Sequence, residues 1–197
     1  MKQNECAVSP VIGVMLMIVV TIIIAAIVSA FAGDMSGGQT TTPVASIQCS
    51  IVKPDAHNAT LTMTHLSGDP INTRDMRIIV SYKDANGNPK QTRTSGSSVS
   101  ILNSDDETVS VKVPYLADPK VGSLDSTGDE LTAINYGKYV WNIGQVVTTG
   151  NAAGFTAIFG VDPSTDPSGV NIGDTFNIKL VDINSQKAIF EKDVSVR

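Results

Sequence analysis

The most constraining feature of this sequence is an uninterrupted apolar run near its beginning. Residues 7–33 read AVSPVIGVMLMIVVTIIIAAIVSAFAG and contain no charged side chain. A bilayer accepts about 20 consecutive apolar residues as one spanning helix. A helix also satisfies its own backbone hydrogen bonds where water is absent. The run therefore predicts a membrane-spanning helix, which divides a short polar leader, residues 1–6, from the long remainder of the chain.

The ends of this helix can be placed from individual residues. Ser9 is a good N-cap, and Pro10 suits the first helical position, where no backbone N–H is required. Gly33 supplies a stop, and Asp34 is the first charge after the run. We therefore expect a helix from Pro10 to about Ala32. Small side chains that allow close approach of a neighbouring helix recur along it: Gly13, Ala25, Ala26, Ser29 and Ala30.

Three interpretations compete for the apolar run. A cleaved secretory signal peptide has an apolar core of only about 7–15 residues, although Ala30-Phe31-Ala32 fits its cleavage pattern. A permanent signal anchor explains the composition equally well. The third interpretation rests on the sequence itself: residues 5–33, with SPVIGV at the head of a long Ile/Val/Ala helix, closely resemble the N-terminal segment of archaeal type IV pilins and pilin-like proteins.

This resemblance implies a processing site and a mode of assembly. In that family a prepilin peptidase cuts on the leader side of the apolar segment, which here falls between Cys6 and Ala7. The helix is retained and bundles with other copies to form a filament core. A cysteine before the cut and a leader with a single lysine depart from the family pattern. The motif itself comprises Ser9, Pro10, Val11, Ile12 and Gly13.

The sequence patterns of two related protein classes, bacterial pilins and archaellins, are absent from this segment. The Glu that follows the cut in bacterial pilins has no counterpart, because no charge occurs before Asp34. The Gly-rich opening of archaellins is also missing. The resemblance therefore implies an adhesive filament more than a swimming one.

Charge and cysteine content exclude several classes of function. The net charge is −5, and no run of Lys or Arg is present, which argues against nucleic acid as a partner. Cys6 and Cys49 lie on opposite sides of the apolar run, so they do not form a disulfide scaffold. The sequence contains no HExxH, GxSxG or P-loop pattern. We read His57 and His65 as structural residues, and we expect no enzyme activity, metal or cofactor.

The chain beyond the helix begins with a linker. Residues 34–45 are rich in Gly and Thr and include Pro43, a composition typical of a flexible stretch followed by an extended one. The single Lys2 before the helix and the absence of basic residues directly after it are compatible with a cytoplasmic N-terminus and an outside domain. The family resemblance implies the same topology.

From Ser46 onward the hydrophobic period changes to two, which is typical of strands. Short strands separated by turn clusters predict an all-β sandwich of immunoglobulin-like character over residues 46–197, with no second helix. A helical turn around residues 129–133 is the exception considered. The expected strands are residues 46–52, 59–65, 76–82, 91–94, 97–102, 108–114, 139–147, 155–161, 175–183 and 188–196.

Two further stretches of the domain carry a looser resemblance to archaeal pilin-like β domains. They are residues 64–71, THLSGDPI, and residues 173–196 near the C-terminus. Within the first stretch we interpret His65, Gly68 and Asp69 as turn residues. Trp141 is interpreted as a core residue, since large aromatic side chains are buried on average.

A few sites on the domain have a chemical meaning. Asn58-Ala59-Thr60 is an N-glycosylation sequon at a turn, so Asn58 is a glycosylation candidate if the domain is outside the cell. A chance sequon is the alternative. The acidic residues 105–107 and 162–166 could bind calcium through carboxylates, but they lack EF-hand spacing, and solvated loops explain them more simply.

Two functions of different classes follow from the sequence. The first is a pilin-like structural subunit that is trimmed, extracted from the membrane and polymerised through its helix for adhesion. Its partners would be copies of itself or other pilins, the prepilin peptidase, the assembly machinery and membrane lipid. The second is a monomeric, membrane-anchored β domain that binds a surface sugar, a solute or an envelope protein.

Overall fold

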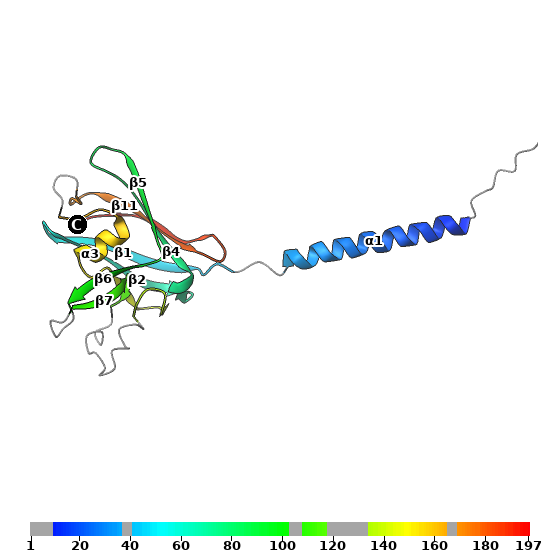
Figure 1. Ribbon diagram of the computed structural model, residues 1–197, viewed down its shortest axis with the longest axis horizontal. Coiled ribbons are helices and arrows are strands. Elements are labelled where there is room, and N and C mark those ends of the chain that lie inside the picture. Colours follow the sequence, from blue (N-terminus) through cyan, green and yellow to red (C-terminus); the bar gives the residue numbers. More distant parts are fainter. Residues whose placement is uncertain (1–9, 37–40, 103–107, 118–133, 165–168) are drawn as a thin grey trace, which may run out of the picture. The chain divides into compact units, whose positions relative to one another are not determined.

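The computed structural model describes residues 10–36, 41–102, 108–117, 134–164 and 169–197 (Figure 1). The chain forms two compact units, Met1–Thr40 and Thr41–Arg197. The first contains one helix, and the second contains the β domain. The predicted fold class, a long apolar helix followed by a β-sandwich domain, is confirmed.

Helix α1 spans Pro10–Ser36 and starts at the predicted proline. Its apolar side chains face outward on every side, with exposed fractions from 45% at Val20 to 70% at Met17 and Phe31. The predicted stop at Gly33 is wrong, because the helix continues through that residue to Ser36. A single glycine costs a helix only about 1 kcal/mol relative to alanine, so Gly33 weakens the helix without ending it.

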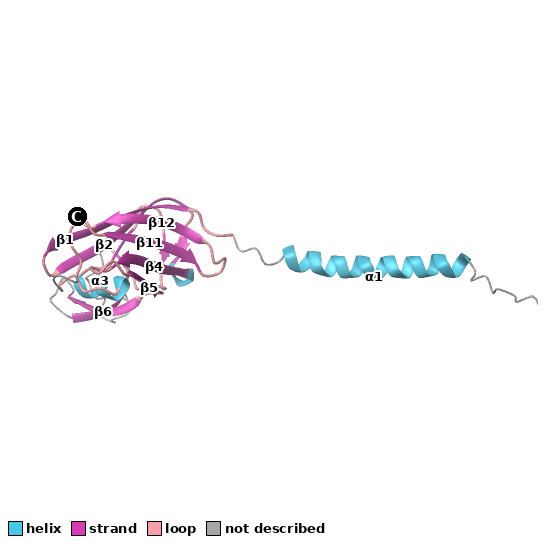
Figure 2. Ribbon diagram, turned by 90° about the horizontal axis from the view of Figure 1, so that it is seen from above, coloured by secondary structure: helices cyan, strands magenta, loops and turns pink. Residues whose placement is uncertain are grey.

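The described residues of the β domain form two four-stranded antiparallel sheets and two short pairs (Figures 1 and 2). The first sheet has the order β1 (Ala45–Asp55), β2 (Asn58–Gly68), β10 (Val146–Thr148), β8 (Tyr115–Leu116). The second has the order β12 (Ala188–Ser195), β11 (Thr175–Asp182), β4 (Met76–Lys83), β5 (Pro89–Thr94).

The two short pairs complete the described strands. Strand β3 (Ile71–Asn72) pairs with β9 (Val140–Trp141), and β6 (Ser97–Leu102) pairs with β7 (Thr108–Val113). A 3₁₀ turn, η1 (Thr73–Asp75), joins β3 to β4. The C-terminus is tied to the first sheet, since the Arg197 N–H donates to Ile51 O at 3.2 Å and Lys53 N–H donates to Arg197 O at 2.8 Å.

The period-two pattern of the sequence appears directly in the burial of the strands. In β2 the residues Ala59, Leu61 and Met63 are fully buried, while the threonines between them are half-buried. Both sheets contribute inward side chains to one continuous apolar core. The domain therefore has its own core, built entirely from residues of the second unit.

One predicted strand is instead a helix. The sequence predicts an extended segment over residues 155–161, but Ala152–Phe159 forms helix α3, which lies beside β6 (Figures 1 and 2). The Asn151 side chain caps its start by accepting from Gly154 N–H at 2.9 Å, and Gly160 ends it with φ at 72°. The Phe, Thr and Ile residues favour a strand locally, but the Asn cap and Gly stop fix a helix.

Helix α3 places aromatic side chains in the core. Phe155 and Phe159 stack with ring centroids 3.9 Å apart, and both rings contact Phe176 of β11 edge-on, at 6.2 and 5.0 Å. Their spacing of four residues puts both rings on one helix face. The helix thus adds two stacked phenyl rings to the core that both sheets share.

The region around Trp141 also differs from the prediction. The single strand expected over residues 139–147 is divided into β9 and β10 by a turn that contains Gly144, whose φ is 82°. Trp141 itself is fully buried, as predicted, and its Nε1–H donates to Gln145 O at 3.0 Å. The turn lets the same short segment pair with β3 and then with β2.

The interpretation of His65 as a turn residue is wrong. His65 lies within β2, is fully buried, and contacts Trp141 with ring centroids 5.5 Å apart. Among the residues that the structure describes, neither ring nitrogen has a hydrogen-bond partner. Gly68, in contrast, has a φ of 111° at the end of β2, as a turn residue should. The helical turn considered at residues 129–133 lies outside the described residues.

Candidate functional site

Helix α1 is the first candidate site, because its surface cannot remain in water. The span Val11–Ala32 has a mean hydropathy of 3.2, and none of it is buried within the chain. Each large apolar side chain left in water forgoes about 1.5–3 kcal/mol of burial. Soluble monomers rarely expose apolar patches of more than a few hundred Å². The helix surface therefore needs lipid or protein around it.

The geometry of α1 suits a bilayer. The 22 residues of Val11–Ala32 extend for about 33 Å at a rise of about 1.5 Å per residue, close to the roughly 30 Å hydrocarbon thickness. Thr21 is polar, but its hydroxyl donates to Ile18 O at 2.8 Å within the helix. The span therefore presents no unsatisfied side-chain hydroxyl to lipid at this position.

The motif residues occupy the start of this helix. Pro10 is the first helical residue, and Val11, Ile12 and Gly13 form the first turn, with no atom near the position a Gly13 Cβ would take. Ser9, Cys6 and Ala7 lie outside the described residues. The cleavage between Cys6 and Ala7 stays a prediction.

Hydrogen bonds hold Thr42 and Val44, near the start of the β domain, against its body. Thr42 Oγ1–H donates to Ser185 Oγ at 2.7 Å, and Val44 N–H donates to the Asp69 carboxylate at 3.0 Å. In return, Asp69 N–H donates to Val44 O at 2.8 Å. A Cβ added to Gly68 would lie only 2.2 Å from that same Val44 oxygen. The glycine therefore permits the close backbone contact that holds the first residues of the domain.

The glycosylation candidate opens strand β2. Asn58 faces Asp55 across the β1–β2 turn and is half-buried. Its Oδ1 is buried without a hydrogen-bond partner among the described residues. Glycosylation at Asn58 stays a prediction.

The two histidines do not form a metal pair. His57 is exposed at one end of β2, and His65 is buried near the other, about 25 Å along the strand at roughly 3.3 Å per residue. Within the described residues, no three His, Cys, Asp or Glu side chains converge as a metal site would require.

The acidic stretches offer no described calcium site. Residues 105–107 and 165–166 lie outside the described part of the chain. The Asp162 carboxylate accepts from Ser164 Oγ–H at 2.6 Å and Ser164 N–H at 2.8 Å. These bonds lower the pKa of Asp162 below its ordinary value. The carboxylate thus caps its own loop.

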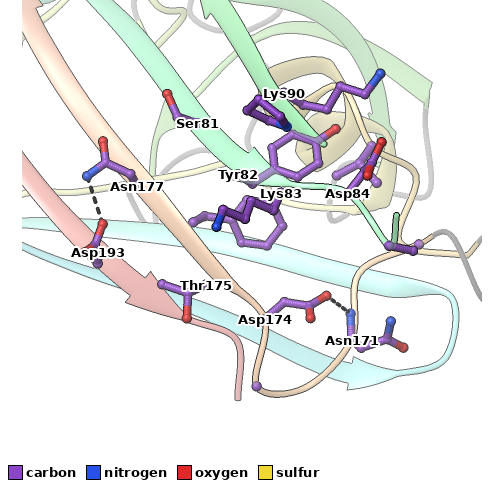
Figure 3. Close-up of a pocket in the computed structure, with 16 residues that line it drawn as sticks. Ser81, Tyr82, Lys83, Asp84, Lys90, Asn171, Asp174, Thr175, Asn177 and Asp193 are labelled. Atoms are coloured by element: carbon purple, nitrogen blue, oxygen red, sulfur yellow. Dashed lines mark hydrogen bonds between the residues drawn. The ribbon is translucent and has the colours of Figure 1, made fainter. Parts of the chain in front are cut away.

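A cleft of about 650 Å³ lies at one end of the second sheet, a feature that sequence reasoning missed (Figure 3). Tyr82 of β4 pairs with Lys90 of β5 and packs against Phe176 with ring centroids 5.2 Å apart. Burial raises the pKa of Tyr82, and the nearby Asp84 adds to the shift. No local motif marks the cleft, because its residues come from four strands and two loops.

Four of the polar residues that line this cleft bond to each other in two pairs. Asn177 Nδ2–H donates to the Asp193 carboxylate at 2.8 Å, and Asn171 N–H donates to the Asp174 carboxylate at 2.7 Å (Figure 3). Hydrogen bonds led by that from Asn88 N–H hold the pKa of Asp84 below its ordinary value. The carboxylates of Asp193 and Asp174 are engaged within the protein, which suits binding by contact more than acid–base chemistry.

The comparisons with known proteins agree with the N-terminal motif. Residues 6–47 match the sequence model of the family described as archaeal type IV pilin, N-terminal. An uncharacterized protein of Archaeoglobus fulgidus is 37% identical over 84 residues. That alignment covers 42% of this chain and 57% of the relative, less than two thirds of its length. The resemblance read from the SPVIGV motif is confirmed: the chain has a pilin-like N-terminal segment on a membrane-compatible helix.

Proposed function

We propose that this protein is a structural subunit of an archaeal type IV pilin-like surface filament. A prepilin peptidase removes residues 1–6, α1 anchors the chain in the membrane, and copies polymerise through α1 into an adhesive filament. The observation that carries the proposal is that α1, the segment matched by the pilin family, is apolar on every side and wholly exposed.

The physical basis is a helix with two acceptable surroundings. Lipid covers α1 before assembly, and other copies of α1 cover it afterwards. Between helices in lipid there is no hydrophobic gain, so association depends on close packing. Gly13, Ala25 and Ala26 supply small surfaces for it. Water is excluded as a third environment by the exposed Ile, Val, Leu, Met and Phe side chains.

The proposal includes topology and chemistry. The N-terminus faces the cytoplasm and the β domain lies outside, where Asn58 can be glycosylated. The domain acts by binding and not by catalysis, with no metal or cofactor. The hydrogen bonds that join Asn177 to Asp193 and Asn171 to Asp174 within its cleft support this part of the proposal.

The cleft in Figure 3 favours a second candidate function. In it the chain remains a monomeric membrane anchor, and the domain binds a surface sugar, a solute or an envelope protein. Both candidates need α1 in the membrane, but only the first needs contacts between copies of α1.

A charge in the middle of α1 tests the proposal. Ile22 is 62% exposed on the helix, and an Asp at the centre of a spanning helix costs about 2.5–3.5 kcal/mol on insertion scales. We expect Ile22→Asp to abolish incorporation into extracellular filaments, while the matched Ile22→Leu incorporates normally. Immunoblots of sheared filaments and of membranes measure both. Normal incorporation of Ile22→Asp contradicts a filament core made of α1.

A further inference from the structure

A second pocket on the β domain has an unusual charge composition. It measures about 390 Å³ and lies where the β6–β7 hairpin meets η1 and residues 135–138. We call it the cationic pocket and define it by the three cations and three serines that line it: Arg74, Lys112, Lys138, Ser95, Ser98 and Ser110.

The strand register explains how the hairpin contributes. Ser98 of β6 lies directly opposite Lys112 of β7, so their side chains share one face, and Ser110 joins them two residues away. Val111 points to the opposite face and is buried. The alternation that builds the core on one side therefore collects lysine and serine on the other.

Backbone contacts hold the cationic pocket in shape. Lys112 N–H donates to Asn135 Oδ1 at 2.7 Å, and Tyr136 N–H donates to Lys112 O at 3.0 Å. A Cβ on Gly96 would lie 2.9 Å from Lys112 Cε. The missing side chain at Gly96 thus leaves room for the lysine stem.

Two hydrogen bonds fix the backbone next to the other two cations, Arg74 and Lys138. Gly137 N–H donates to Thr73 Oγ1 at 3.0 Å, and the Thr73 hydroxyl donates to Tyr139 O at 2.7 Å. Thr73 is fully buried. Arg74, which follows Thr73, and Lys138, which follows Gly137, are exposed at the rim of the pocket. Two rim cations therefore project from a buried, hydrogen-bonded base.

The cationic pocket carries an excess of positive charge among the described residues. Its lining includes no Asp or Glu among the described residues, although the chain has 19 acidic against 14 basic residues. The ion pair found in the described residues, Lys179–Glu191 at 2.9 Å, lies elsewhere, on β11 and β12. Within the same residues, no side-chain hydrogen bond or ion pair engages the cations of the pocket. Like charges gathered without a counter-charge repel, and an anionic ligand relieves that repulsion.

We infer that the cationic pocket binds an acidic sugar unit of a surface polysaccharide, through its carboxylate or sulfate group. Arg binds such planar or tetrahedral oxyanions with paired N–H donors, and Lys supplies further charge. The exposed serine hydroxyls can exchange hydrogen bonds with sugar hydroxyls. The volume lies within the range of about 300–1,000 Å³ typical of small-ligand sites. This inference rests on the proposed adhesive function and names its ligand class.

The test uses the full chain in detergent and three defined polymers. Polygalacturonate carries carboxylates, dextran sulfate carries sulfates, and unmodified dextran is neutral. The pocket variant is Arg74→Gln/Lys112→Gln/Lys138→Gln. The matched control is Arg93→Gln/Lys187→Gln/Lys192→Gln, which removes two lysines and one arginine from exposed positions that line neither the cationic pocket nor the cleft in Figure 3. Affinity is measured by titration calorimetry at low salt and at about 0.15 M salt.

We expect at least one acidic polymer to bind the unmodified chain, while neutral dextran does not. The pocket variant should bind about tenfold or more weakly and the control within about twofold, since exposed charges outside a site contribute little at physiological ionic strength. The polymer that binds identifies the carboxylate or the sulfate as the recognised group. Equal losses in both variants show non-specific attraction and overturn the inference, as does equal binding of neutral dextran.

Two readouts separate loss of the binding site from loss of folding or of self-association. Arg74→Gln/Lys138→Gln leaves the packed Lys112 stem in place, so it should lose affinity with an unchanged unfolding temperature. If the pocket variant instead changes only the oligomeric state, the occupant is a second copy and the sugar assignment is wrong. Filaments that adhere equally with and without the three cations refute the pocket's role but leave the filament proposal standing. Sugar binding by chains that never enter filaments refutes the filament proposal alone.

Discussion

Helix α1 and the β domain handle apolar side chains in opposite ways. In α1 the Ile and Val residues cover every side and none is buried, whereas in β2 apolar and polar residues alternate and the apolar ones are fully enclosed. The domain completes its core within one chain, while α1 can be completed only by lipid or by other helices. A structural subunit needs this division. Its exposed apolar helix drives assembly, while its β domain, with a complete core, stays folded during assembly.

The largest expected effect comes from separating the two regions. We expect a chain that begins at Thr41 to be monomeric and folded in plain buffer, because every residue of the buried core lies in the second unit. The full chain should need detergent or lipid to stay in solution. Sedimentation velocity with circular dichroism measures both. Aggregation of the shortened chain would show that the domain depends on α1.

The next largest effect should be confined to the domain. Phe155 is fully buried and stacks on Phe159, so Phe155→Ala should lower the free energy of unfolding of the domain by about 3–5 kcal/mol. Ile143, which is 58% exposed, provides a control, and Ile143→Ala should change it by less than about 0.5 kcal/mol. Urea unfolding followed by Trp141 fluorescence measures both. Equal effects would mean that α3 is not part of the core.

The third effect is a loss of stability of the β domain at alkaline pH, which depends on Cys49. Burial raises the pKa of Cys49 to about 12, partly offset by the charge of Lys192. The folded thiol therefore holds its proton at a pH where the unfolded thiol has lost it. The stabilisation is complete below about pH 9 and is lost as pH rises toward about 12.

The measurement for Cys49 is the stability difference between variants as a function of pH. Between about pH 9.5 and 10.5, the advantage of the unmodified chain over Cys49→Ala should fall by about 1.4 kcal/mol, the value of one proton per pH unit. Cys6→Ala is the matched control and should leave the pH dependence unchanged. A constant advantage across this range would show that Cys49 is exposed to solvent or fails to titrate.

The last of these effects concerns the start of the domain. Gly68 has a φ of 111°, and an added Cβ would lie 2.2 Å from Val44 O, whereas Gly87, with a φ of 79°, has open space around it. Gly68→Ala should destabilise the domain by about 3 kcal/mol through strain and collision, and Gly87→Ala by about 1 kcal/mol through strain alone. Thermal unfolding compares them. Equal costs would mean that the Val44–Gly68 contact does not form.

The structure of α1 could be predicted from the sequence more fully than that of the β domain, for a physical reason. The helix and most strands follow from hydrophobic period, which is a local property, so α1 and the strands around Leu61 and Ile78 were found. Helix α3 was missed because Phe155 and Ile158 favour strands, and the decisive signals were a single Asn cap and a single glycine. His65 was misread because its burial depends on Trp141, far along the chain.

The two kinds of candidate site differ in the same way. The pilin-like motif is contiguous, so residues 9–13 identified it directly. The cationic pocket gathers Arg74, Lys112 and Lys138 from three distant segments, and no spacing rule connects them before the chain folds. Contiguous sites can be found in a sequence, but sites assembled by the fold need the structure.

The N-terminus of subunits taken from native filaments tests the central claim most directly. If α1 is kept as the filament core, mass spectrometry of those subunits should find a chain that starts at Ala7 and keeps α1 whole. A thiol assay on the denatured chain should find one free thiol, because the leader that contains Cys6 has been removed and Cys49 remains. A chain that starts at Met1, or one cut beyond Ala32, would contradict the account.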